Sequence, residues 1–238
     1  MHLKEDTFRF KRFDIIQNQS VHRVGTDGVL LGAWVDITGV HKILDVGTGT
    51  GLIGLMLAQR SEGTASITAL EPDVSAHDLA VRNIVNSGFS ASIEVVNQRV
   101  QDFQGGKFDL IVCNPPFFIN SLKPPVEARA SQRHAVGLSF EDLLAATTSH
   151  LSQEGKLCLI LPIDEGNFFM ELALKFSLHL SKQCVVFSKV GKVEERYLLE
   201  LTHSATNRLK KTSLTIMESN GAWTSEYKSL TREFYLKF

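Results

Sequence analysis

Short apolar segments alternate with helix-length segments through most of the 238-residue chain, and this alternation limits the folds that it can adopt. A strand, a helix and a second strand form a right-handed βαβ unit, and a series of such units builds a mostly parallel sheet with helices on both faces. The sequence predicts strands at residues 42–46, 66–70, 92–96, 108–113, 157–161, 182–188 and 196–201. It predicts helices near residues 51–60, 74–87, 140–151 and 165–176. We therefore expect a doubly wound α/β sheet, which binds ligands beyond the carboxyl ends of its strands.

The last two predicted strands are joined by the segment SKVGKVEE, which is too short to hold a crossover helix. We expect these strands to form an antiparallel hairpin at the end of the mostly parallel sheet. A strand-like piece at 213–217 and a tail through residue 238 follow the hairpin. Because no linker divides the chain, we expect a single domain over 1–238, with a core of about 25–202 and short basic extensions at both ends.

The composition, with 43% hydrophobic and 21% charged residues, is typical of a soluble globular protein. The N-terminus MHLKEDTFRF lacks the apolar core of a signal peptide, and no apolar run is long enough to span a bilayer. Three distant cysteines without a CxxC pattern indicate reduced, buried thiols. The eight histidines lack metal-ligand spacing. We therefore expect a cytoplasmic monomer that binds neither a membrane nor a metal.

The charges are unevenly distributed along the chain. Residues 1–25 carry five Lys or Arg against three acids, and residues 182–238 carry ten against six, so the middle is strongly acidic. A basic margin around an acidic centre fits a protein that holds a polyanion at its rim and a cation inside. Unevenly solvated surface charge explains the pattern equally well.

The first predicted strand runs into the glycine-rich segment ILDVGTGTGLIG, residues 43–54. Residues 49–54 match GxGxxG, and Glu71 ends the next strand, which together match a dinucleotide-binding fingerprint. Asp45, however, stands two residues before the first glycine, where a carboxylate repels a pyrophosphate and attracts an ammonium or sulfonium group. S-adenosylmethionine carries both of these cations and no phosphate, so Asp45 favours it. The loop glycines expected to approach the cofactor are Gly47, Gly49 and Gly51.

Two further carboxylates follow strands and are candidate cofactor ligands. Glu71 can accept hydrogen bonds from both ribose hydroxyls, although a charge is also common where Pro72 ends a strand. Asp102, in RVQDF after the third strand, can accept from the adenine amino group. An Asx turn or a helix cap would explain Asp102 about as well.

The fourth predicted strand, KFDLIVC, runs directly into NPPF. Proline has no amide hydrogen for a sheet ladder, so the strand must end there. Asn114 then projects into the crevice that holds the cofactor, where its side-chain oxygen and the carbonyl of Pro115 can accept the two hydrogens of a planar amino group. This grip would direct the nitrogen lone pair at a methyl donor without a strong base. Phe117 would stack on a flat, flipped-out base, whereas Phe118 is expected to pack in the core.

These motifs carry a resemblance. DVGTGTG at 45–51 with NPPF at 114–117 resembles the class I methyltransferases that modify sp² amino nitrogens. VGTDGVLLGAW at 24–34 and the final YKSLTREFYLKF are similar to the bacterial tRNA1(Val) adenine N6-methyltransferase family. The resemblance implies methyl transfer from S-adenosylmethionine to an adenine N6 in tRNA, beside the valine anticodon. It also implies that a TDG stretch closes the cofactor pocket near the methionine end, here Thr26, Asp27 and Gly28.

Cationic contacts to tRNA phosphates are expected from the long connection at 118–137 and from both ends of the chain. The candidates are Lys11, Arg12, Arg23, Lys123, Arg129, Arg133, Lys189, Lys192, Arg208, Lys210 and Lys211. For any single one of them, a solvated surface charge is the better explanation.

Four other functions remain open from the sequence. An NPP motif also suits guanine N2 in ribosomal RNA or a glutamine amide in a protein, since both present a planar NH2 group. A non-catalytic scaffold that binds the cofactor and acts as an RNA chaperone is possible, although Asp45, Glu71 and Asn114 are intact. A NAD-dependent reductase is the remaining alternative, and Asp45 argues against it.

Overall fold

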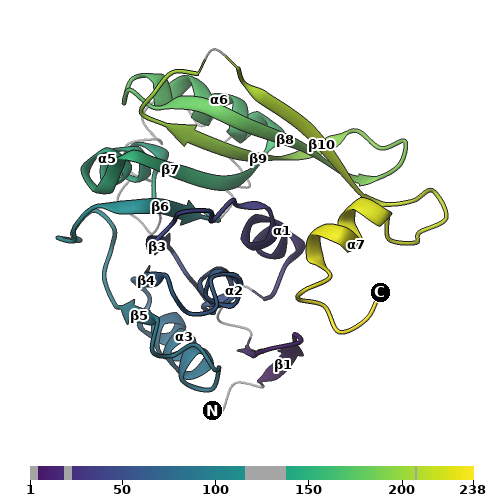
Figure 1. Ribbon diagram of the computed structural model, residues 1–238, viewed down its shortest axis with the longest axis horizontal. Coiled ribbons are helices and arrows are strands. Elements are labelled where there is room, and N and C mark those ends of the chain that lie inside the picture. The colour runs from purple at the N-terminus through teal and green to yellow at the C-terminus, as the bar shows by residue number, and fades with distance from the viewer. Residues whose placement is uncertain (1–4, 19–22, 116–137, 207) are drawn as a thin grey trace, which may run out of the picture.

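The computed structural model describes residues 5–18, 23–115, 138–206 and 208–238, and its centre is an eight-stranded sheet (Figure 1). The strand order is β10-β8-β9-β7-β6-β3-β4-β5. The strands are β3 (Lys42–Val46), β4 (Ser66–Leu70), β5 (Ile93–Val96), β6 (Phe108–Cys113), β7 (Leu151–Pro162), β8 (His179–Lys189), β9 (Glu194–Thr202) and β10 (Lys210–Met217). Within this described sheet, β9 alone runs antiparallel to its neighbours. The predicted hairpin, β8–β9, is confirmed.

Helices cover both faces of the sheet, which confirms the doubly wound α/β class (Figure 1). One buried cluster joins the sheet to helices α1 (Thr26–Trp34), α2 (Leu52–Arg60) and α3 (Val74–Val85). A second cluster, on the opposite face, joins it to α5 (Phe140–His150) and α6 (Ile163–Leu174). Neighbouring strand residues alternate between the clusters, as with Ile43 and Leu44, because successive side chains of a strand point to opposite faces.

Strand β7 and the N-terminal segment differ from the expectation. Strand β7 begins at Leu151 instead of residue 157, because Leu151 pairs with Phe108 of β6 and Lys156 with Leu110, on either side of an irregularity in register. A second, two-stranded sheet of β1 (Asp6–Arg9) and β2 (Asp14–Gln17) was not predicted. Four-residue strands contain too few alternating positions to give a clear periodic signal.

Both ends of the chain pack into the core on the α1 side of the sheet. Phe10 and Phe13, from the N-terminal hairpin, are buried there with Tyr227 of helix α7 (Ser225–Thr231) and with Phe234. The Lys11 amide donates to the Phe234 carbonyl over 2.8 Å, so the two ends contact each other directly. We therefore propose that the folding unit extends beyond the expected core of about 25–202 to include both ends.

The composition predicts buried cysteines and no helix able to span a membrane. All three cysteines are buried, as predicted, and burial raises the pKa of each thiol. Among the helices that the structure describes, none combines the length and the apolar character that a membrane crossing needs. The described side chains also contain no group of three or more His, Cys, Asp or Glu suited to hold a metal ion.

Helix α1 packs unusually close to α2 because glycine faces α2 at two positions four residues apart. A Cβ atom on Gly32 would lie 2.7 Å from the Met56 sulfur and 3.1 Å from the Met56 Cβ. A Cβ on Gly28 would lie 3.0 Å from a Leu52 methyl carbon. Residues four apart share a helix face, so the glycines of the TDGVLLG segment have a packing role as well as a place near the strand ends.

The Gly32→Val substitution is expected to destabilise the fold through this contact. Overpacking a core costs about 1–3 kcal/mol, and each kcal/mol lowers the melting temperature by about 2–4 °C in a chain of this size. Gly88→Val is the matched control, because no described atom would lie within 4 Å of its Cβ. Thermal unfolding of the two variants checks the prediction, and equal melting temperatures would contradict it.

Candidate active site

The predicted site residues on strands β3 and β6 share one side of the sheet. In the register of these parallel strands, Asp45 lies opposite Val112. Val112 belongs to the core cluster on the α1 side, and Asn114, two residues further on, therefore points to the same side. Asp45 shares that face with Ile43. The carboxylate and the carboxamide thus face the same side of the sheet, near its carboxyl edge.

The glycine loop between β3 and α2 is held to the next strand by backbone hydrogen bonds. The amides of Gly47 and Thr48 donate to the Leu70 carbonyl over 2.9 and 3.0 Å. Gly49 and Gly51 have φ angles of 59° and 83°, in the left-handed region that favours glycine. A Cβ on Gly49 would meet no described atom within 4 Å, so this backbone is open to a ligand.

Asp45 is fully buried and binds the loop that it precedes. Its Oδ2 accepts hydrogen bonds from Thr48 Oγ1 at 2.6 Å and from the Gly54 amide at 3.1 Å. Its Oδ1 is buried and has no partner among the described residues. Burial raises the pKa of Asp45 to about 6. The carboxylate thus accepts a hydrogen bond from an amide in the first turn of α2, the kind of group that would otherwise bind a pyrophosphate. Its other oxygen remains available for a cationic ligand.

Glu71 is buried at the end of β4 beside the loop. Its Oε2 accepts from the Gly49 amide at 2.9 Å and its Oε1 from the Asp73 amide at 3.0 Å. A carboxylate has about four acceptor positions, so Glu71 can still accept from a ligand. Asp102 lies in an exposed turn after β5, and its role toward a ligand stays a prediction.

The TDG segment and the NPPF motif, distant in sequence, are neighbours in the fold. A Cβ on Gly28 would lie 3.8 Å from the Asn114 side-chain nitrogen. The Asn114 Oδ1 is buried and has no hydrogen-bond partner among the described residues. Pro115 is buried next to it, whereas Phe117 lies outside the described residues. An unused acceptor at the carboxyl edge is therefore ready for a donor from a ligand.

Two residues that the sequence did not single out support this arrangement. Arg196 Nε, on β9, donates to Asp27 Oδ2 over 3.0 Å. Asn83, on α3, donates to the Thr50 carbonyl at 2.9 Å and exchanges two hydrogen bonds with the backbone of Ile16. Neither residue belongs to a motif, so only their places in three dimensions reveal these contacts.

The candidate RNA-binding residues have different surroundings. Lys11 donates to the Arg232 carbonyl, and Arg12 pairs with Glu62 at 2.8 Å. Arg23 is exposed just before α1, and Lys210, Lys211 and Arg208 are exposed at or before the edge strand β10. Lys189 and Lys192 flank the β8–β9 turn, and Lys123, Arg129 and Arg133 lie outside the described residues. Contact of any of them with RNA stays a prediction.

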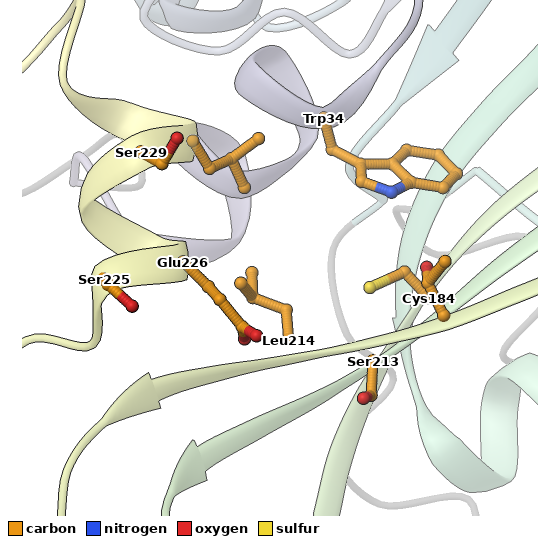
Figure 2. Close-up of a pocket in the computed structure, with 9 residues that line it drawn as sticks. Trp34, Cys184, Ser213, Leu214, Ser225, Glu226 and Ser229 are labelled. Carbon is orange, nitrogen blue, oxygen red and sulfur yellow. The ribbon is translucent and has the colours of Figure 1, made fainter.

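A cavity of about 580 Å³ lies elsewhere, between α7, β10 and the last residue of α1. Figure 2 shows Trp34, Cys184 and Glu226 around it. Gly28 is in the first turn of α1 and Trp34 is its last residue, so this cavity is at the opposite end of the helix from Asn114. It does not include the predicted site residues.

Comparisons with known proteins show which family the chain is similar to. The model of the methyltransferase small domain family matches residues 28–163. A tRNA1(Val) (adenine(37)-N6)-methyltransferase of Bacteroides thetaiotaomicron is 41% identical over 230 residues, which cover 96% of this chain and 97% of the relative. A relative of the same name from Trichodesmium erythraeum is 43% identical, covering 97% of this chain and 98% of its own.

Solved structures share the fold at low sequence identity. A structure described as a predicted O-methyltransferase from Agrobacterium tumefaciens matches with a TM-score of 0.65 and 21% identity, over 87% of this chain and 96% of that one. TYW2 from Pyrococcus horikoshii, in complex with MeSAdo, matches with a TM-score of 0.58 and 13% identity, over 85% and 73% of the two chains. At these identities the likeness shows the fold alone.

Proposed function

The chain belongs to the methyltransferase small domain family and, within it, to the tRNA1(Val) (adenine(37)-N6)-methyltransferase family, and on this premise we propose that it methylates an adenine of tRNA at N6. The methyl group would come from S-adenosylmethionine, and the adenine would lie beside the anticodon of a valine tRNA. The observation that carries this proposal is the unused Asn114 side-chain oxygen, which lies beside Gly28 at the carboxyl edge. The names of the relatives support adenine N6 over the guanine N2 and glutamine amide alternatives.

The residues at the strand ends fit S-adenosylmethionine. The buried Asp45 oxygen without a described partner suits a cation, and Glu71 has acceptor positions left for ribose hydroxyls. The open backbone at Gly49 allows a close approach. When bound, S-adenosylmethionine supplies an electrophilic methyl group on a sulfonium centre.

Catalysis by this chain would depend on alignment. The Asn114 Oδ1 and the Pro115 carbonyl oxygen would each accept one hydrogen of the adenine amino group. Both hydrogen bonds favour a pyramidal nitrogen and strengthen as positive charge develops on it, so they act mainly in the transition state. Phe117 would stack on the adenine ring. The reaction needs no strongly basic side chain to remove a proton before the methyl transfer.

A direct experiment incubates the protein with S-adenosylmethionine and total tRNA from cells that lack the enzyme. Nucleoside mass spectrometry of the tRNA is expected to detect N6-methyladenosine in a valine tRNA only when the protein is present. Methylguanosine would favour the guanine alternative. Methylated protein with unmethylated RNA would favour the glutamine alternative, and both results contradict the proposal.

The basic residues of β10 provide a test of the tRNA-binding surface. The double substitution Lys210→Glu and Lys211→Glu should reduce the slope of log Kobs against log salt by about two, if each lysine neutralises one phosphate. Lys107→Glu with Lys175→Glu is the matched control, because Lys107 precedes β6 and Lys175 caps the C-terminus of α6, both exposed near the amino edge of the sheet. Filter binding across a salt series measures both slopes. An unchanged slope in the β10 variant would exclude these two lysines from the tRNA contact.

A further inference from the structure

The first turn of α1 carries the TDG segment, and the described residues around it provide no side-chain cap for the helix start. Gly25 stands at the N-cap, where no described side chain accepts a hydrogen bond from the helix amides. The preceding Val24 amide donates to Gln17 Oε1 at 2.9 Å. A helix start of this kind depends on contacts from elsewhere in the fold to keep one position.

Arg196 supplies such a contact from strand β9, on the face of the sheet that α1 covers. It lies opposite Pro162, the last residue of β7, so it is level with the carboxyl edge. It shares its face of β9 with Leu198, which belongs to the core cluster on the α1 side. Its side chain therefore extends toward α1, where Nε donates to Asp27 Oδ2 over 3.0 Å.

This ion pair differs from an ordinary surface pair in its burial. The Arg196 and Asp27 side chains are 29% and 20% exposed, whereas those of the Arg82–Glu5 pair are 50% and 40% exposed. The guanidinium is also oriented by a 2.9 Å hydrogen bond from Nη1 to the Glu195 carbonyl. A partly buried, directed pair restricts the carboxylate more strongly than a mobile surface pair does.

We propose that Arg196 is a positioning residue that acts through Asp27 to hold the first turn of α1 over the carboxyl edge. Gly28 follows Asp27 directly and lies beside Asn114, so a shift of this turn changes the width of the crevice at the reacting end. Arg196 thereby makes β9 part of the cofactor site. This inference rests on the proposed function, because it takes that crevice as the site of S-adenosylmethionine.

The test measures binding of S-adenosylhomocysteine to the full chain by titration calorimetry. Arg196→Gln is expected to weaken binding about tenfold, the loss of about 1.4 kcal/mol of preorganisation. Its melting temperature should fall by about 2–4 °C, because losing a partly buried ion pair costs about 1 kcal/mol in a chain of this size. In turnover assays, the KM for S-adenosylmethionine should rise with kcat nearly unchanged. Arg196→Lys, which keeps the charge, should recover part of the affinity.

A double-mutant cycle separates action through Asp27 from direct contact with the ligand. If Arg196 acts through Asp27, the variant with both Arg196→Gln and Asp27→Asn should bind no more weakly than Asp27→Asn alone. Arg82→Gln is the matched control, since it removes the Arg82–Glu5 pair, 2.7 Å long, in which no predicted site residue takes part. It should bind like the wild type.

Three results would overturn the inference. Wild-type affinity in Arg196→Gln, or additive losses in the double variant, would exclude the positioning role while leaving the proposed function intact. A wild-type chain that binds neither S-adenosylhomocysteine nor S-adenosylmethionine would overturn the proposed function together with this inference.

Discussion

The Asn114→Ala substitution is expected to lower the rate of methyl transfer by about 100- to 1,000-fold, the usual cost of removing one preorganised hydrogen-bonding group from a transition state. The Asn114 Oδ1 is buried and has no partner among the described residues, so its loss leaves no structural hydrogen bond broken there. We therefore expect the affinity for S-adenosylmethionine to change by less than about threefold, under 1 kcal/mol. Single-turnover rates and calorimetry measure the two quantities separately.

Asn86→Ala is the control for this experiment, because Asn86 is exposed at the end of α3. It should have the wild-type rate. If Asn114→Ala instead lost rate and cofactor affinity by equal factors, Asn114 would be a binding residue and its proposed catalytic role would be wrong.

The Asp45→Asn substitution should reduce the affinity for S-adenosylmethionine about 10- to 100-fold at pH 7.5, since a hydrogen bond to a charged group contributes about 1.5–3 kcal/mol. Asparagine can still accept from Thr48 and Gly54 through its oxygen, as Asp45 Oδ2 does. Its amide nitrogen would then replace Asp45 Oδ1 and direct a donor at the cation. Calorimetry measures the loss.

The same substitution should stabilise the chain without its cofactor. Burial raises the pKa of Asp45 from 3.8 to about 6, so the folded state prefers the protonated form. The stability that this group contributes is present below pH 3.8 and is lost as the pH rises through 6. The loss is about 3 kcal/mol for a shift of this size. At pH 7.5 the neutral carboxamide of the Asp45→Asn variant avoids the loss, which urea unfolding would detect.

The affinity for S-adenosylmethionine should depend on pH in the opposite direction to the stability of the chain. A cation favours the carboxylate, so wild-type affinity should fall as the pH drops through about 6 and binding should release protons. Asp109→Asn is the matched control, because Asp109 also accepts from two backbone amides, those of His41 and Lys42, but at the amino end of the sheet. A wild-type affinity in Asp45→Asn, or a pH-independent wild type, would contradict the role of Asp45.

The sequence predicts the central strands well because they are buried on both faces. β3, β4 and β6 begin and end where expected, since short, mostly apolar runs between polar segments have sharp limits. The polar start of β7 and the short N-terminal strands lack such apolar runs and were therefore not predicted. Their pairing depends on partners in the fold and leaves no periodic pattern in the sequence.

The site is predictable where topology alone determines it. Asp45, Glu71 and Asn114 follow the ends of parallel strands, and such ends share one edge of a sheet. The family resemblance implied only that Gly28 closes the pocket near the methionine end, and neither its closeness to Asn114 nor the Asp27–Arg196 pair was expected. Both depend on where α1 crosses the sheet, which no local pattern in the sequence specifies.

The two proposed hydrogen bonds to the adenine amino group are best tested by a crystal structure of the chain with S-adenosylhomocysteine and an adenine-containing anticodon stem-loop. The account predicts that Asn114 Oδ1 and the Pro115 carbonyl oxygen each lie about 2.7–3.2 Å from the adenine N6, with the cofactor sulfur on the other side of that nitrogen. An Asn114 side chain directed into the core, or an adenine N6 bound away from both oxygens, would contradict it.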